Sequence, residues 1–312
     1  MKVPAKYLFE KAYGKFCIPA INISNPEQVH GLFSAAQKFK APFILQTTPA
    51  AREYAHPKML LNYISAAAEI YPDVIYAVHV DHGFESHLHD AISSGAYTSV
   101  MIDASHDSIE KNIERTKAII TLAHPKNISV EAELGVLSGV EDDLDIDEAN
   151  ALYTNPSDVE YFVKSTNCDS LAVAVGTSHG AYKFSSGKGL RFDLLEEIQN
   201  RLPNFPIVLH GASTVDLEEV RRINEAGGGL QNNVKGVSEE EVKRAITYGV
   251  CKLNIATDLR LLWLRIFREF FRDHNGEWDH LKPGKQYMQE LEYLLEQKFK
   301  MLGNIGKAHL YK

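Results

Sequence analysis

Short runs of apolar, often β-branched residues recur along the chain, and stretches with helical spacing of apolar positions lie between them. The runs are mostly continuous rather than alternating, which is typical of parallel strands buried on both faces. The eight predicted strands are 16–23, 43–47, 75–80, 98–103, 128–133, 170–175, 206–210 and 250–255. The helical stretches between them include 58–71, 108–124, 157–166 and 215–226, several of which open with Asp, Ser or Pro.

Eight such units without a break in composition predict an α/β fold, a closed (β/α)8 TIM barrel that takes up residues 1–312 as one domain. The alternative is a doubly wound open sheet, which would often carry a Gly-rich turn after its first strand. The first strand here ends in NISNPEQ instead, so the barrel is favoured. Residues from about 258 to 302 predict extra amphipathic C-terminal helices that close the barrel or build a subunit interface.

Two segments are expected to be loops. Residues 134–156 form a long acidic stretch after the fifth predicted strand, and residues 227–237 are rich in Gly and Asn. We expect the second segment to be mobile, because Gly and Asn cluster in irregular connections. Most of the acidic residues in the first segment are expected to be a solvated surface.

The composition limits the classes of function that the protein could have. The 312 residues are 45% hydrophobic and 24% charged, as in an ordinary globular enzyme. A formal net charge of -8 argues against a nucleic-acid partner, because phosphate backbones attract clustered Lys and Arg. Cys17, Cys168 and Cys251 are far apart, which favours a reducing cytoplasm over a disulfide framework. No apolar stretch is long enough for a membrane span, so we expect a soluble cytoplasmic protein without a membrane partner.

Histidines stand where three predicted strands end: His82, His179 and His210. Barrel enzymes build their active sites at these carboxyl ends. Three imidazoles with an open fourth position suit a catalytic zinc ion, one per chain. His79 and His106 are the alternative candidates for metal ligands. A structural role is favoured for both, because His79 lies within its strand and His106 lies just past a strand end, where it could cap a helix.

Small polar residues after the last three strands predict a phosphate site. Glycine lets backbone N–H groups approach an anion, and hydroxyl, amide and Lys groups complete the cradle. Loops after the seventh and eighth strands are the usual phosphate position in this fold. The candidate pairs are Gly180 with Lys183, Gly211 with Ser213, and Asn254 with Thr257.

Six motifs, taken together, resemble the class II fructose-bisphosphate aldolase family. They are VDHG at 80–83, SVMIDASH at 99–106, VEAELG at 130–135, GTSHGAYKF at 176–184, VLHGAS at 208–213 and CKLNIATDLR at 251–260. The resemblance runs in order over nearly the whole chain. It implies a zinc-dependent, reversible aldol cleavage of fructose 1,6-bisphosphate to dihydroxyacetone phosphate and glyceraldehyde 3-phosphate, a reaction of glycolysis and gluconeogenesis.

The resemblance also implies roles for individual residues. His82, His179 and His210 would bind the zinc ion, and Asp81 would transfer the proton of the C4 hydroxyl group. Glu141 would move the proton next to the carbonyl, while Asp103 and Glu133 would orient the metal ligands. The phosphate of the triose would meet Gly180, Lys183, Gly211, Ser213, Asn254 and Thr257.

Further partners follow from the same resemblance. Arg260 matches a residue that reaches the other phosphate from a neighbouring subunit, so a homodimer or homotetramer is expected. A monovalent cation, Na⁺ or K⁺, near the phosphate is also implied. The small-molecule partners would be sugar phosphates.

Ala256 departs from the fructose pattern, which usually has an acidic residue there. Tagatose-bisphosphate aldolases resemble this chain at Ala256, at 48–51 and at 151–156, whereas Lys183, Arg260 and the Gly-rich segment match the fructose branch. The two ketoses differ only in configuration at C4, so Ala256 is a candidate specificity residue. Fructose 1,6-bisphosphate is favoured, and tagatose 1,6-bisphosphate stays open.

Two other classes are weighed against an aldolase. A metal-dependent hydrolase on a similar barrel would more often show an HxH pair on its first strand, and NISNP has none. A non-catalytic phosphosugar-binding protein would be expected to have lost Asp81, Glu141 or a zinc ligand, and all are present.

Overall fold

In the computed structural model, the residues described are 1–135, 139–141, 144–146, 153–177, 189–213, 216–231 and 236–312. Within them, eight parallel strands close a barrel in the order β1-β10-β9-β8-β5-β4-β3-β2. The predicted TIM barrel is therefore confirmed. The strands are β1 (Ile18–Asn22), β2 (Phe43–Thr47), β3 (Tyr76–Gly83), β4 (Ser99–Ile102), β5 (Ser129–Leu134), β8 (Ser170–Val173), β9 (Ile207–Leu209) and β10 (Val250–Ile255).

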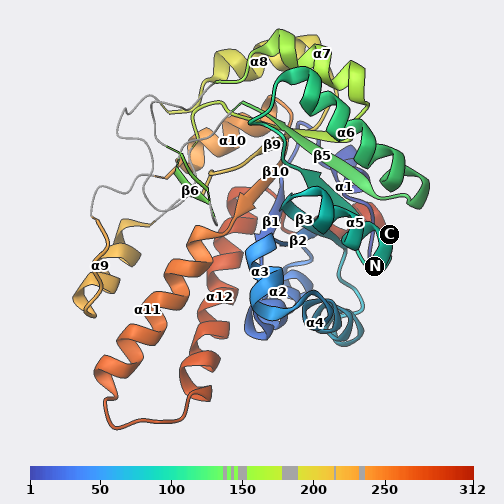
Figure 1. Ribbon diagram of the computed structural model, residues 1–312. Coiled ribbons are helices and arrows are strands. Elements are labelled where there is room, and N and C mark those ends of the chain that lie inside the picture. The colour runs from blue at the N-terminus through green and yellow to red at the C-terminus, as the bar shows by residue number, and fades with distance from the viewer. Residues whose placement is uncertain (136–138, 142–143, 147–152, 178–188, 214–215, 232–235) are drawn as a thin grey trace.

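Helices surround the barrel, as Figure 1 shows. Their bounds are α1 (Ala5–Ala12), α2 (Pro26–Phe39), α3 (Pro49–Ala55), α4 (Pro57–Ile70), α5 (Glu85–Ser94), α6 (Ile109–Ala123), α7 (Pro156–Thr166), α8 (Phe192–Arg201), α9 (Leu217–Glu225), α10 (Glu239–Thr247), α11 (Thr257–Asp273) and α12 (Leu281–Met301). Among the described residues, no helix is long and apolar enough to cross a membrane.

Side-chain caps mark where many helices begin. Asn25 accepts a hydrogen bond from the Gln28 N–H and Pro26 opens α2, so two of the usual start signals coincide. Ser238 and Glu241 form a capping box at α10. Helix α6 is capped by Ser108, and His106 lies exposed in the preceding turn. The suggestion that His106 could cap a helix is therefore wrong, because the helix starts two residues later on a better acceptor.

Part of the segment predicted as a loop forms strands. β6 (Gly139–Glu141) and β7 (Leu144–Ile146) pair antiparallel, with Gly139 opposite Ile146. The many acidic residues of 134–156 hid this hairpin, because strand patterns are recognised by apolar alternation.

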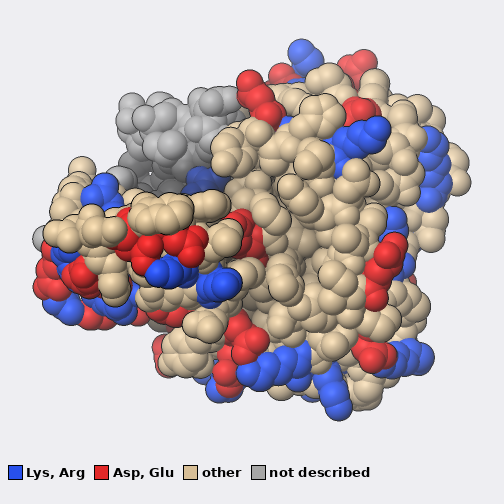
Figure 2. Space-filling model, turned by 90° about the horizontal axis from the view of Figure 1, so that it is seen from below, with Lys and Arg blue, Asp and Glu red and all other residues tan. Residues whose placement is uncertain are grey.

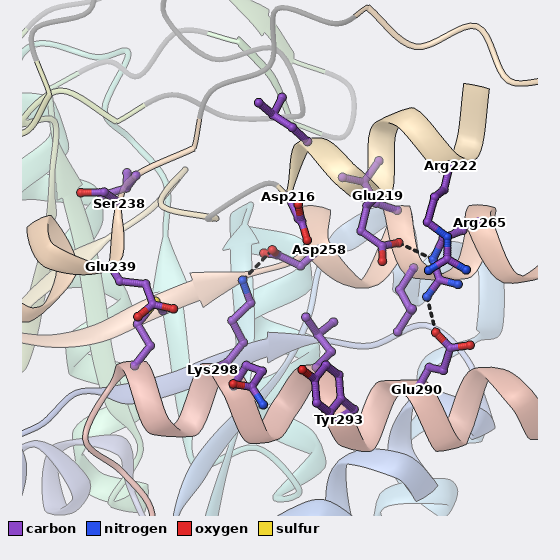
Figure 3. A pocket seen from close by; sticks show the side chains of 17 residues that line it. Asp216, Glu219, Arg222, Ser238, Glu239, Asp258, Arg265, Glu290, Tyr293 and Lys298 are labelled. Carbon is purple, nitrogen blue, oxygen red and sulfur yellow. Dashed lines mark hydrogen bonds and ion pairs between the residues drawn. The ribbon is translucent and has the colours of Figure 1, made fainter. Parts of the chain in front are cut away.

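The predicted C-terminal helices are α11 and α12. Figure 1 shows them side by side, extending away from the barrel beyond α9. α12 also packs along α2, so the pair is anchored to the barrel shell at one end. A cavity of about 660 Å³ lies between α9, α10, α11 and α12, and Arg265 is one of its lining residues (Figure 3). On the face shown in Figure 2, acidic and basic side chains are interspersed.

Candidate functional site

Two of the three candidate histidines are brought together at the barrel mouth. His82 lies near the end of β3 and His210 directly follows β9. Their ring centroids are 4.6 Å apart and their planes are tilted by 68°. His82 has φ of 50°, a left-handed conformation that is uncommon outside glycine and often marks functional sites. His179, the third candidate, lies outside the described residues.

A carboxylate fixes the orientation of the His82 ring. Nδ1 of His82 is 2.8 Å from Oδ2 of Asp103, and 3.9 Å from Oε2 of Glu133. Oδ1 of Asp103 accepts a hydrogen bond from the Ser105 hydroxyl at 2.9 Å. Burial would raise the pKa of Asp103, but the hydrogen bonds from His82 and Ser105 outweigh it and hold that pKa well below its usual range. Since Asp103 engages Nδ1, metal coordination by His82 would use Nε2.

A second carboxylate orients His210. Nε2 of His210 is 3.0 Å from Oε1 of Glu131, and both side chains are buried. Burial, followed by the nearby His82, lowers the pKa of His210. His210 is therefore neutral near pH 7, which is the protonation state that a metal ligand needs.

The donor groups at the mouth fit a divalent metal ion. One ligand atom each from Asp81, His82 and His210 lies within 4.8 Å of the others, and the same holds for His82, Asp103 and Glu133. Imidazole and carboxylate donors at this spacing suit zinc, and also accept cobalt or iron.

Asp81 is held by three side-chain amide groups. Oδ2 accepts hydrogen bonds from Asn22 at 2.9 Å and from Gln46 at 3.0 Å, and Oδ1 accepts one from Asn254 at 3.0 Å. The donors come from β1, β2 and β10, and Asp81 itself is fully buried. Asn22 and Gln46 were not among the predicted site residues. A signal existed, because each is a polar residue at the carboxyl end of an otherwise apolar strand.

A buried polar cluster lies inside the barrel below the histidines. It contains His79, Glu131 and Lys252, each at most 1% exposed. Burial would raise the pKa of Glu131, but Lys252 and His210 keep it well below the usual range. Burial, followed by the charge of Lys252, lowers the pKa of His79 to about 3. His79 thus points into the barrel and is uncharged near pH 7.

The described part of the predicted phosphate site follows the end of β9, lies in β10 and includes the start of α11. Ser213 and Asn254 are buried, and Gly211 has φ of 59°. α11 begins at Thr257, and Ala256 before it provides no side-chain cap. The N-cap residue therefore satisfies none of the first N–H groups of this helix, which favours an anion there. Arg260 is exposed one turn further along α11.

Four predicted site residues lie wholly or partly outside the described part of the chain. Gly180 and Lys183, like His179, fall on residues that the structure does not describe. Glu141 ends strand β6, of which only the backbone is described.

Comparisons with known proteins agree on one family. The family model described as "Fructose-bisphosphate aldolase class-II" matches residues 3–307. A fructose-bisphosphate aldolase of Treponema pallidum is 39% identical over 98% of this chain and 97% of its own length. One of Giardia intestinalis is 39% identical over 96% of this chain and 91% of its own length.

Solved structures agree with the fold. The YdjI aldolase from Escherichia coli K12 is 27% identical, with a TM-score of 0.78 over 99% of this chain and 100% of that one. A fructose-bisphosphate aldolase from Campylobacter jejuni is 20% identical and has a TM-score of 0.76 over 98% of this chain and 97% of that one, a likeness of fold alone.

Proposed function

The chain belongs to the class II fructose-bisphosphate aldolase family, and we propose which of its residues perform the reaction. It is a metal-dependent lyase that cleaves fructose 1,6-bisphosphate reversibly. The products are dihydroxyacetone phosphate and glyceraldehyde 3-phosphate. The observation that carries the assignment of roles is Asp81, fixed by three amide groups beside two histidines that are themselves oriented by carboxylates.

Zinc is the proposed metal, held by His82, His179 and His210. It would polarise the C2 carbonyl group of the ketose and stabilise the negative charge left on the triose when the C3–C4 bond breaks. Asp103 and Glu133 would orient His82, the former through the 2.8 Å contact to Nδ1.

Asp81 is the proposed proton acceptor in cleavage. It would take the proton of the C4 hydroxyl group, C4 would become the aldehyde carbon, and the electron pair of the C3–C4 bond would stay with C3. Asn22, Gln46 and Asn254 hold the carboxylate still, which reduces the reorganisation needed at the moment of transfer. Glu141 would then deliver a proton to C3.

The substrate phosphates would lie on either side of this centre. The triose phosphate would meet the uncapped start of α11 together with Asn254, Thr257, Gly211 and Ser213, and Gly180 and Lys183 would complete its cradle. Arg260 of one subunit would reach the other phosphate of a substrate bound in a neighbouring subunit. This role would require a homodimer or homotetramer. Na⁺ or K⁺ near the phosphate and a cytoplasmic location stay predictions.

Ala256 bears on which ketose is preferred. It stands at the N-cap of α11, two residues after Asn254, which bonds Asp81. A methyl group there cannot hydrogen-bond near C4, so discrimination between fructose and tagatose 1,6-bisphosphate would be relaxed.

The test is a coupled cleavage assay on both ketose bisphosphates, with and without a chelator, followed by zinc add-back. We expect chelator-sensitive cleavage that zinc restores, faster on the fructose substrate. The ratio of the two rates measures the discrimination at C4. No cleavage of either substrate by fully metallated protein would contradict the function and favour a phosphosugar-binding role.

A further inference from the structure

A fully buried lysine lies inside the barrel, below the histidines. Nζ of Lys252, on β10, is 2.9 Å from Oε1 of Glu131 on β5. A buried ammonium group is strongly destabilising unless it is paired, and Glu131 provides that partner. The mechanism proposed above gives this lysine no role.

The carboxylate oxygen that receives Lys252 also receives His210. Oε1 of Glu131 lies 3.0 Å from Nε2 of His210 and accepts from both donors. A hydrogen bond from Nε2 requires that the proton of the neutral ring sit on this nitrogen. His210 must then present Nδ1 to any ion bound at the barrel mouth.

Other strands hold Lys252 in place. Its Nζ is 3.5 Å from Nε2 of His79, whose Nδ1 is 2.8 Å from the hydroxyl group of Ser99. The second oxygen of Glu131 is 4.0 Å from Nε2 of His79. The cluster thus connects β3, β4, β5 and β10 across the barrel interior, and the carboxylate of Glu131 has little freedom to turn away from His210.

We infer that Glu131 and Lys252 are positioning residues for the metal site: Glu131 sets the tautomer and orientation of His210, and Lys252 holds Glu131 in place and balances its charge. The inference rests on the proposed function, which makes His210 a zinc ligand. The competing explanation is that the pair only stabilises the barrel. The two differ in what an uncharged replacement would do to metal affinity.

The main variant replaces the pair by apolar side chains of similar size, Glu131→Leu with Lys252→Met. Such replacements of buried ion pairs commonly preserve folding. In chelator-stripped protein titrated with Zn²⁺ against a chromophoric competitor, we expect zinc affinity to fall about 10- to 100-fold, as is typical when a partner of a metal ligand is lost. Unchanged affinity in the folded variant would overturn the inference.

A conservative variant separates positioning from stability. Glu131→Gln with Lys252→Met restores an acceptor for Nε2 of His210 without a charge, and should recover most of the lost affinity. A matched control removes another buried pair, Asp258→Asn with Lys298→Met, whose 2.6 Å contact joins α11 to α12. That control should keep wild-type zinc affinity. Equal losses in all three variants would show that stability alone is being measured, and would overturn the inference.

An independent measurement needs no variant. In the ¹⁵N-labelled, zinc-free protein, the ring nitrogens of His210 should report protonation on Nε2. Protonation on Nδ1 would overturn the inference directly. Failure of the proposed function is seen elsewhere: wild-type protein would bind no zinc, or His82→Ala would keep a full complement of it.

Discussion

Asp81 is a buried carboxylate whose two oxygens accept three hydrogen bonds from amide groups. These hydrogen bonds hold the carboxylate in one orientation, so it has a fixed direction in which it could accept a proton. We predict that Asp81→Ala lowers the turnover number by a factor of about 10² or more, within the usual range for a general base. The coupled assay measures the rate, and metal analysis measures zinc per chain.

Zinc content should be near normal in this variant, because the loss should affect proton transfer rather than metal binding. Asp73→Asn, at an exposed aspartate paired with Lys312, serves as the control and should keep wild-type turnover. Turnover within about tenfold of wild type in Asp81→Ala would be too small an effect for a general base and would remove Asp81 from that role.

His79 makes the fold sensitive to acid. Burial, with Lys252 adding to it, lowers the pKa of His79 from 6.5 to about 3. The unfolded chain therefore takes up a proton at this residue as the pH falls through 6.5, whereas the native state does not until about 3. The free energy of unfolding therefore falls as the pH drops from 6.5 to about 3. The stabilisation that comes from keeping His79 uncharged is fully present above pH 6.5.

We predict that the urea midpoint of zinc-free protein falls between pH 7 and pH 5, and that His79→Gln makes the fall shallower. Glutamine is uncharged at every pH and can still hydrogen-bond Ser99. His309→Gln, at an exposed histidine, is the control and should retain the wild-type slope. Identical slopes in all three proteins would show that His79 does not govern the acid response.

At the scale of elements, the start of α11 allows helix stability and the proposed substrate preference to be tested by the same substitution. Ala256 leaves this 17-residue helix without a side-chain cap, next to the predicted phosphate site. We predict that Ala256→Asp raises the free energy of unfolding by about 1 kcal/mol, because aspartate caps helices well. It should also raise the ratio of fructose to tagatose cleavage several-fold, since a carboxylate can hydrogen-bond near C4.

Ala256→Ser separates the two effects. Serine caps a helix but carries no charge, so stability should rise while the cleavage ratio stays close to wild type. Urea unfolding and the coupled assay on both substrates measure the two quantities. If Ala256→Asp leaves the ratio unchanged, Ala256 is not the specificity residue.

Elements differ in how far the sequence predicts them. The barrel strands were found because strands buried on both faces are continuous apolar runs. Helix α1 was not, because its role depends on distant partners. Its buried Leu8 and Phe9 belong to one apolar cluster with Ile18, Cys251 and Tyr311, which come from both ends of the chain. Local pattern carries no information about such contacts.

In the candidate site, too, some residues could be predicted from local sequence and others could not. His82 and His210 were predicted because parallel strands bring their carboxyl ends to one rim. The partners of these residues were harder to predict, because they depend on how the barrel closes. Asn254 is 173 residues from the Asp81 that it bonds, and Glu131 is 121 residues from Lys252. Pairing polar residues inside an apolar barrel requires the strand order and register, which the sequence does not state.

At the scale of the whole molecule, Arg265 connects the helices that extend from the barrel. Its buried guanidinium group on α11 bonds Glu219 of α9 at 2.6 Å and Glu269 of α11 at 3.0 Å, and also bonds Glu290 of α12. Figure 3 shows Arg265 between Glu219 and Glu290 at the wall of the cavity. One side chain thus holds three helices around a hollow that apolar packing does not fill.

We predict that Arg265→Met lowers the free energy of unfolding by about 2 kcal/mol or more, because three carboxylates would lose their shared partner. The loss of stability should affect unfolding of the whole protein and not only of the C-terminal helices, because α12 packs on α2 as well as on α11. Urea unfolding of zinc-loaded protein, followed by circular dichroism, measures it.

Arg221→Met is the matched control: Arg221 also bonds two glutamates, Glu218 and Glu225, but it is 55% exposed. Its loss should change the free energy of unfolding far less than the loss of Arg265, because solvent screens surface ion pairs. Equal effects of the two substitutions would mean that Arg265 does not hold α9, α11 and α12 together.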